Sequence, residues 1–203
     1  MRLRHLAISL SKLKPHPCEN VDLEQYSTDG NIASQFISSI VSFGDLSPDS
    51  IVGDLGAGNG ILGIGALKLG AKKCIFLEAD IRACEILQEN LVLNYLNESG
   101  VIINEFLDTN TNFPKVDLIV CNPPWGRQKE KADRPFLDLI IENGAISYLM
   151  HSSHATHLRP FFESRNWSVE KYDEHDFILP ANFSHHRKEK ESTRVAFWRF
   201  SPN

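Results

Sequence analysis

The chain has 203 residues, of which 42% are hydrophobic, and a formal net charge of −5. This length and apolar content favour one domain over residues 1–203 with a substantial core. A negative net charge does not suggest a nucleic-acid-binding protein, so such a role would depend on how the basic residues are distributed. The absence of a run of about 18 apolar residues argues against a membrane span.

The N-terminal segment and the cysteines indicate an intracellular protein. Residues 1–8 lack the apolar core and cleavage site of a signal peptide, and they predict a short amphipathic helix that extends to Leu13. The cysteines form no CxxC pair, which is typical of reduced thiols and indicates no metal site. We expect a cytoplasmic protein, or a nuclear one in a eukaryote. The four cysteines are Cys18, Cys74, Cys84 and Cys121.

Apolar periodicity predicts an alternation of helices and strands. A first helix, capped by Thr28 or Asp29, would extend to Phe43. Strands are expected near 51–55, 73–78, 101–106, 116–121 and 145–150, and helices near 60–69, 81–96, 134–143 and 153–165. This pattern predicts a mostly parallel sheet covered on both faces. The last two strands, near 167–176 and 193–200, have no helix between them and would form an antiparallel pair.

A glycine-rich turn follows the first strand. Gly58-x-Gly60-x-x-Gly63 matches a dinucleotide-binding pattern, but Gly58 lies three residues beyond the strand, where that pattern would begin directly after it. The alternative, Asp54-x-Gly56-x-Gly58-x-Gly60, places a glycine directly after the strand and a carboxylate at its end. A carboxylate there would repel a pyrophosphate but suits an ammonium group. The electrostatics therefore favour S-adenosylmethionine, which carries an ammonium and a sulfonium and no phosphate.

Two further acids follow the next predicted strands. Glu78 ends the strand near 73–78, where it could accept hydrogen bonds from both ribose hydroxyls of the cofactor. Asp108, after the strand near 101–106, is placed to bind the adenine amino group. For Asp108, a turn or cap before Thr109 is an equally good interpretation.

The tetrapeptide Asn122-Pro123-Pro124-Trp125 ends the strand near 116–121. The Asn122 side-chain oxygen and the Pro123 carbonyl can each accept one hydrogen of a planar amino group, and the prolines fix the backbone that carries them. Trp125 offers a face on which a flat ring can stack, worth about 1–3 kcal/mol for a nucleobase. The alternative is a strand-ending Pro-Pro turn with a core tryptophan.

With these residues in hand, the chain resembles the methyltransferase-like five family of N6-adenine methyltransferases that modify small-subunit ribosomal RNA. The resemblance covers about residues 23–200 and rests on six blocks in order. They are Leu23-Glu24-Gln25-Tyr26-Ser27-Thr28, the turn 54–60, Asn122 to Gly126, Ala132-Asp133-Arg134-Pro135-Phe136-Leu137, Tyr148-Leu149-Met150-His151-Ser152, and Leu179-Pro180-Ala181-Asn182-Phe183 with a basic run after it. The chain has Trp125 where the family usually has Phe, Ser27 where it has Pro, and Glu78 where it has Asp.

The resemblance implies a Rossmann-like class I methyltransferase domain, a seven-stranded sheet with the last strand antiparallel. It implies that residues 1–28 close over the cofactor site, with Tyr26 and Thr28, and more weakly Gln25, near the methionine end. Two basic loops would flank the RNA entrance, and a small zinc-binding activator protein would pair onto a sheet edge. The basic residues expected to contact RNA are Arg127, Lys129, Arg134, Arg187 and Lys188.

The predicted reaction is direct methyl transfer from S-adenosylmethionine to an adenine N6, with Asn122 and Pro123 accepting the N6 hydrogens and Trp125 stacking the base. One rival is a methyltransferase acting on a protein glutamine amide, which is also planar. A second is a cofactor-binding subunit without catalysis, and a dehydrogenase is a third. His151, His154 and His157 repeat every three residues as on one side of a helix, but no carboxylate or cysteine accompanies them in sequence, so no metal is expected there.

Overall fold

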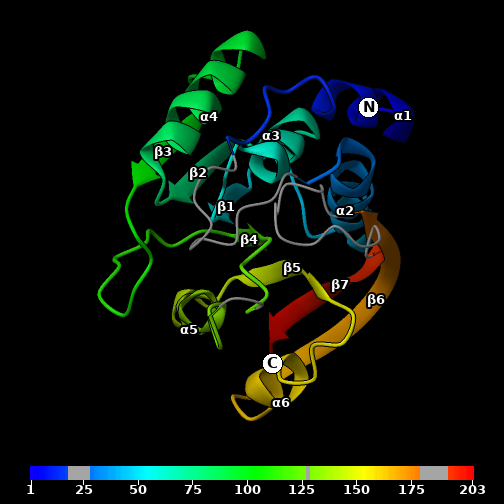
Figure 1. The fold of residues 1–203 in the computed structure, drawn as a ribbon, viewed down its shortest axis with the longest axis vertical. Helices are drawn as coiled ribbons and strands as arrows, with labels where there is room; N and C mark the ends of the chain where they lie inside the picture. The colour runs from blue at the N-terminus through cyan, green and yellow to red at the C-terminus, as the bar shows by residue number, and fades with distance from the viewer. Residues whose placement is uncertain (18–27, 127–128, 179–191) are drawn as a thin grey trace, which may run out of the picture.

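A seven-stranded sheet forms the centre of the computed structural model, which describes residues 1–17, 28–126, 129–178 and 192–203 (Figure 1). The strand order is β3-β2-β1-β4-β5-β7-β6. The first five strands are all parallel, and β7 is antiparallel to both of its neighbours, β5 and β6. The strands are β1 Ile51–Leu55, β2 Lys73–Glu78, β3 Gly100–Asn104, β4 Leu118–Cys121, β5 Ile146–Ser152, β6 Trp167–Ile178 and β7 Ser192–Pro202. The predicted fold class is thereby confirmed.

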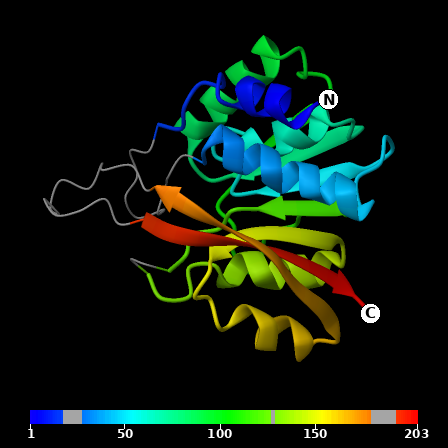
Figure 2. The same ribbon diagram turned by 90° about the vertical axis from the view of Figure 1, so that its right-hand side faces the viewer.

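Helices cover both faces of this sheet, and the two sets lie on opposite sides of it in Figures 1 and 2. The residues buried on one face come from the first four helices, and those on the other from the last two. The first set is α1 Leu3–Leu10, α2 Gly30–Phe43, α3 Ile61–Lys68 and α4 Ile81–Leu93. The second set is α5 Arg134–Asn143 and α6 Leu158–Glu163.

Strand β4 is apolar throughout because both of its faces are covered. In β4, Leu118 and Val120 join the core under the N-terminal helices, while Ile119 and Cys121 join the core under α5 and α6. Successive strand residues point to opposite faces, so a strand buried on both sides has no polar alternation. This is why the run before Asn122 lacks the alternation of an exposed sheet.

The predicted helix over 153–165 is wrong in its first half. Strand β5 continues to Ser152, which pairs with Val195 of β7, and the Ser153 amide donates to the Arg194 carbonyl. Helix α6 therefore begins only at Leu158. The other predicted elements are present with ends shifted by a few residues, and α4 stops at Leu93 rather than residue 96. No helix among the described residues is long and apolar enough to span a bilayer.

The first helix of the predicted pattern is capped by Asp29 rather than Thr28. The Asp29 carboxylate accepts the amides of Asn31 and Ile32, and α2 ends at Gly44, whose φ of 80° is left-handed. Fully buried Phe36, Ile37 and Ile40 then hold α2 against the sheet.

We expect Asp29→Ala to lower the free energy of unfolding by about 1 kcal/mol, because two amides at the start of α2 lose their acceptor. Asp29→Asn, which keeps a side-chain oxygen, should lose much less. Urea unfolding of both variants followed by circular dichroism measures the difference. Equal stability of Asp29→Ala and wild type would contradict the capping role.

Candidate functional site

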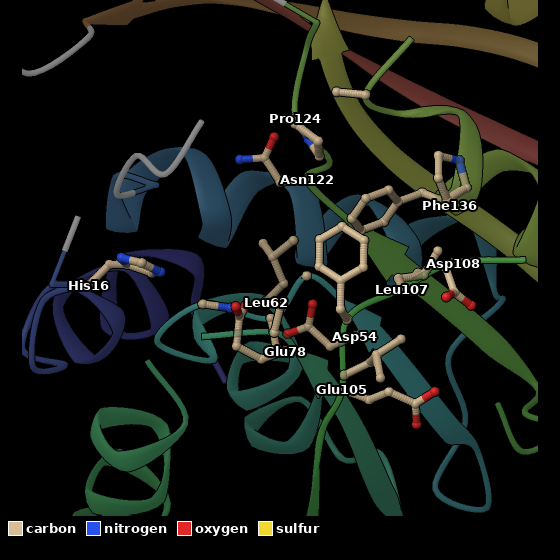
Figure 3. A pocket seen from close by; sticks show the side chains of 18 of the residues that line it. His16, Asp54, Leu62, Glu78, Glu105, Leu107, Asp108, Asn122, Pro124 and Phe136 are labelled. Atoms are coloured by element: carbon tan, nitrogen blue, oxygen red, sulfur yellow. The ribbon is translucent and has the colours of Figure 1, made fainter. Parts of the chain in front are cut away.

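A cavity of about 350 Å³ lies beyond the carboxyl ends of β1, β2 and β4 (Figure 3). Strand β1 has β2 on one side and β4 on the other, so the chain order of the sheet reverses here. Ligands of open parallel sheets bind at such a reversal. Asp54, Glu78 and Asn122 stand at or just after these three strand ends, and all three line the cavity, as the sequence predicts.

The turn after β1 follows the Asp54-x-Gly56-x-Gly58-x-Gly60 pattern. Strand β1 ends at Leu55, so Gly56 follows the strand directly. Gly56, Gly58 and Gly60 have φ angles of 67°, 55° and 84°, in the left-handed region that side chains disfavour. A Cβ atom on Gly58 would stand 2.7 Å from Cδ2 of His16, which closes that side of the turn.

Asp54 is a buried carboxylate without an ion-pair partner among the described residues. It is 1% exposed, and its Oδ2 accepts the Gly63 amide from the first turn of α3 at 2.8 Å. Burial raises the pKa of Asp54 to about 8, a shift to which the nearby Glu78 carboxylate adds and which the Gly63 amide opposes. A cation in the cavity would relieve the cost of ionising Asp54 there.

Glu78 is held by the glycine turn itself. Its Oε2 accepts the Gly58 amide at 2.7 Å, and its Oε1 accepts the Asp80 amide at 2.9 Å. Burial raises the pKa of Glu78, and these backbone hydrogen bonds oppose the rise. Each oxygen keeps a lone pair for a further donor. A ligand with hydroxyl groups and a positive charge therefore suits the floor of the cavity.

The position of Asp108 is compatible with both of the roles considered for it. It lines the cavity at the end opposite His16 in Figure 3. Its Oδ1 also accepts the Asn110 amide at 2.7 Å, which makes it a turn residue. Leu107 is buried beside it and also lines the cavity, so this end offers both an apolar surface and a carboxylate.

Asn122 and Pro124 line the cavity across from the two buried carboxylates (Figure 3). The Asn122 amide nitrogen donates to the Thr28 hydroxyl at 3.0 Å, and the Trp125 indole nitrogen donates to the Asn122 oxygen at 3.3 Å. Thr28 also lines the cavity. Pro123 is buried, and Trp125 is half-buried against the core under the N-terminal helices.

Of the residues predicted to contact RNA, the structure places one at the cavity and one away from it. Lys129 lines the cavity, together with Lys131. Arg134 instead pairs with Asp138 one turn later in α5, at 2.8 Å, and its guanidinium lies over the Phe161 ring. Gln25, Tyr26, Arg127, Arg187 and Lys188 lie outside the described residues, as does Cys18.

His16 is a cavity residue that the sequence analysis missed. The segment that carries it is fixed through Lys14, whose amide donates to Asn90 and whose carbonyl accepts from Asn59 and Asn90. Burial lowers the pKa of His16, although the Asp80 carboxylate opposes this shift. Its contact with Gly58 joins positions 42 residues apart, and neither position carries a local signal for it.

The expectation that no carboxylate accompanies the spaced histidines is wrong. Asp133 lies between His151 and His157, within 3.1 Å and 2.5 Å of their Nε2 atoms, whereas His154 stands outside this cluster. His151 belongs to β5 rather than to a helix. Burial alone would raise the pKa of Asp133, but the hydrogen bonds from the two histidines lower it well below its usual range.

The affinity for S-adenosylmethionine should depend on pH through Asp54. The raised pKa of about 8 means that the empty protein holds this carboxyl neutral below that pH. Binding of an ammonium group favours the ionised form, so affinity should increase toward pH 8 by up to about tenfold per pH unit. Calorimetric titration between about pH 6 and pH 8 measures the Kd.

Asp54→Asn is the matched control, because it keeps an acceptor for the Gly63 amide but cannot ionise. Its affinity should be weaker than that of wild type at pH 8 and should lack the part of the pH dependence that Asp54 causes. Identical pH profiles for the two proteins would show that Asp54 does not meet the cation.

Comparison with known proteins agrees with this geometry. Residues 35–123 match the family model described as ribosomal protein L11 methyltransferase (PrmA), which covers less than half of the chain. An uncharacterized protein of Methanocaldococcus jannaschii is 30% identical over 98% of this chain and 94% of its own. The rRNA N(6)-adenosine-methyltransferase METTL5 of Danio rerio is 29% identical over the full length of both chains.

A solved structure extends the similarity to three dimensions. A Pyrococcus horikoshii protein, described as a proposed RNA methyltransferase, has a TM-score of 0.89 and 36% identity over 100% of this chain and 98% of its own. Both the sequence and the fold are thus shared over the whole length. The chain belongs to the family of methyltransferases that these full-length relatives form, which includes METTL5.

Proposed function

We propose that the protein transfers a methyl group from S-adenosylmethionine to N6 of an adenosine in RNA, with small-subunit rRNA as the substrate. The observation that carries this proposal is the position of Asn122. Its amide stands at the end of β4, across a cavity from two buried carboxylates, and is hydrogen-bonded on both sides. A planar acceptor pair opposite a site for a cation is what methyl transfer to an amino group needs.

The residues of the cavity suit S-adenosylmethionine. Asp54 and the glycine turn would hold its ammonium end, Glu78 its ribose hydroxyls, and Asp108 with Leu107 its adenine. The bound cofactor would supply the methyl group. Residues 1–28 would close over it, and two observations support this: His16 and Thr28 both line the cavity, and Lys14 is tied to Asn59 and Asn90.

The protein side of the reaction concerns the N6 lone pair, which is delocalised into the adenine ring. Oxygen acceptors at Asn122 and Pro123 would each take one N6 hydrogen, favour the pyramidal nitrogen, and stabilise the positive charge that develops. Holding the base in line with the methyl group supplies the remaining rate through proximity. No strong base is required, since the proton can leave after the transfer.

RNA is the proposed substrate, and two exposed lysines at the cavity support it although the chain is acidic. Lys129 and Lys131 are exposed and line the cavity, whose lining also includes the exposed acids Glu105 and Asp108. Trp125 would stack the target base presented from a single-stranded region. With a net charge of −5, few phosphates are neutralised, so affinity for RNA should be weak unless a partner adds basic surface.

A small zinc-binding activator protein is the proposed partner, and the position of β3 at the edge of the sheet formed by the described residues supports it. Strand β3 ends the sheet, and an unpaired strand edge can receive a strand of another protein. Large apolar side chains are exposed beside this edge, with Tyr95 at 93%, Leu93 at 62% and Val101 at 38%. Such exposure on a monomer marks an interaction surface.

Methylation of a protein glutamine remains the second candidate, because a carboxamide presents the same planar amino group to Asn122. The family model that matches residues 35–123 is named for a methyltransferase that acts on a ribosomal protein. That match covers the cofactor half of the chain and ends at Pro123, so it does not extend to the segments around the cavity mouth.

A labelled methyl-transfer assay on unmethylated small-subunit rRNA, with and without the candidate activator, tests the proposal. We expect N6-methyladenosine after digestion to nucleosides. Asn122→Ala should lower the rate at least about 100-fold, as loss of one aligned polar group at a reacting centre does. Its Kd for S-adenosylmethionine should change little, and Asn94→Ala, at the end of α4, should behave as wild type.

Two outcomes would contradict the assignment. Label in a protein fraction but not in RNA would move glutamine methylation to first place. Full activity of Asn122→Ala would remove the proposed catalytic role of the amide, and binding of cofactor without any transfer would favour a non-catalytic subunit.

A further inference from the structure

A cluster of Asp133, His151 and His157, two of them buried, lies beside the site and has no part in the proposed reaction. Asp133 is 4% exposed and His151 is 1% exposed, while the side chain of His157 is half exposed. The Oδ2 atom of Asp133 is the shared partner of both histidines. The three residues come from the start of α5, the end of β5 and the residue before α6.

The backbone fixes the tautomer of His151. The Ser152 amide donates to Nδ1 of His151 at 2.9 Å, so Nδ1 must be an acceptor. In a neutral imidazole the other nitrogen then carries the proton. Nε2 of His151 is therefore the donor to Asp133, and a second proton on Nδ1 would break the bond to Ser152.

This tautomer argues for a hydrogen-bonded cluster rather than a metal site. The three ligand atoms lie within 4.8 Å of one another, which is compatible with an ion. However, a histidine that binds a metal usually donates its other ring N–H to an oxygen acceptor. His151 has the reverse arrangement, since binding through Nε2 would require an imidazole with no proton on either nitrogen.

His151 touches the site through Trp125. The two rings are stacked with centroids 6.0 Å apart and an interplanar angle of 23°. Because both nitrogens of His151 are engaged, its ring cannot rotate without losing a buried hydrogen bond. The ring therefore forms a fixed surface against which the indole lies.

Trp125 in turn fixes which way the Asn122 amide faces. An indole nitrogen can only donate, so the atom opposite it must be the Asn122 oxygen. The Asn122 nitrogen then donates to the Thr28 hydroxyl. A flipped amide would set its NH2 group against the indole N–H.

We propose that Asp133, His151 and His157 form a positioning cluster which, through Trp125, holds the Asn122 amide in this orientation, with its oxygen toward the indole N–H and its nitrogen toward the Thr28 hydroxyl. The cluster does not touch the reacting atoms. Its consequence for catalysis rests on the proposed function, whereas its effect on the Trp125 indole can be measured without any substrate.

The first test observes the indole N–H directly. The chain has three tryptophans, so a 15N NMR spectrum shows three indole signals, and Trp125→Phe identifies the one from Trp125. His151→Phe keeps a flat ring but removes both hydrogen bonds. We expect hydrogen exchange of the Trp125 indole to become about three- to tenfold faster, as for loss of one hydrogen bond.

His157→Ala provides the same test at a half-exposed position, in case His151→Phe does not fold. It should speed exchange in the same direction by a smaller factor. His154→Ala, which lies outside the cluster, is the matched control and should leave exchange and melting temperature unchanged. Unchanged exchange in folded His151→Phe, or in His157→Ala if the former does not fold, would overturn the proposal.

The second test is a double-mutant cycle on methyl transfer. Trp125→Phe keeps a ring for base stacking but loses the N–H, and it should lower kcat about three- to tenfold with little change in KM for RNA. His151→Phe should lower kcat similarly with the Kd for cofactor unchanged. In the Trp125→Phe background His151→Phe should have no further effect, because the bond it supports is already gone.

Effects on kcat that multiply would show that His151 acts independently of Trp125 and would overturn the proposal. If wild type transfers no methyl group to RNA, the proposed function fails, while the exchange experiment still decides whether the cluster orders the indole. The two failures are thus distinguishable.

Discussion

The burial of Asp54 is the constraint on which the rest of the site depends. A carboxylate at the end of a central strand is costly to ionise unless donors reach it. Gly63 supplies one from α3, and it can do so only because the turn between β1 and α3 is tight. That turn requires left-handed backbone at three glycines, and the same turn presents the Gly58 amide to Glu78. The two carboxylates, the turn and the start of α3 are therefore one unit.

The other side of the cavity is built differently. Asn122 stands at the end of β4, but the groups that orient it come from distant parts of the chain. Thr28 precedes α2, and Trp125 is placed against a histidine of β5 that is itself held by Asp133 before α5. The floor of the site is thus set by local backbone geometry, whereas the amide opposite is set by tertiary contacts. Helix α5 contributes to both sides, because Phe136 lies against Gly56 of the glycine turn and lines the cavity.

This difference explains how much could be predicted from the sequence. Strands, most helices and the strand-end residues Asp54, Glu78 and Asn122 follow from apolar runs and the turn motif, which are local signals. The helix expected over 153–165 is wrong in its first half, because the Ser153 amide still bonds to the Arg194 carbonyl and a turn follows, in which the Ala155 amide donates to the Ser152 carbonyl. The place of His16 in the cavity and the contact of Asp133 with two histidines could not be predicted, since each depends on a residue far along the chain. The spacing of His151 and His157 suggested one face of a helix. In the structure His151 lies in β5 and His157 precedes α6, and both reach the Asp133 carboxylate.

The charge distribution connects the acidic composition to the proposed reaction. The cavity holds two buried carboxylates, Asp54 and Glu78, without an ion-pair partner in the described part of the chain, while Lys129 and Lys131 are exposed lining residues. Glu78, and Asp54 once it ionises, would attract a small cation and repel phosphate, so RNA phosphates would remain outside the cavity and only the base would enter. Methyl transfer removes the sulfonium charge and leaves the product with one positive charge fewer. The attraction of the floor for the spent cofactor is then weaker than for the fresh one, because Coulomb energy scales with the ligand charge. The carboxylates of the cavity floor would therefore favour replacement of the spent cofactor by fresh S-adenosylmethionine.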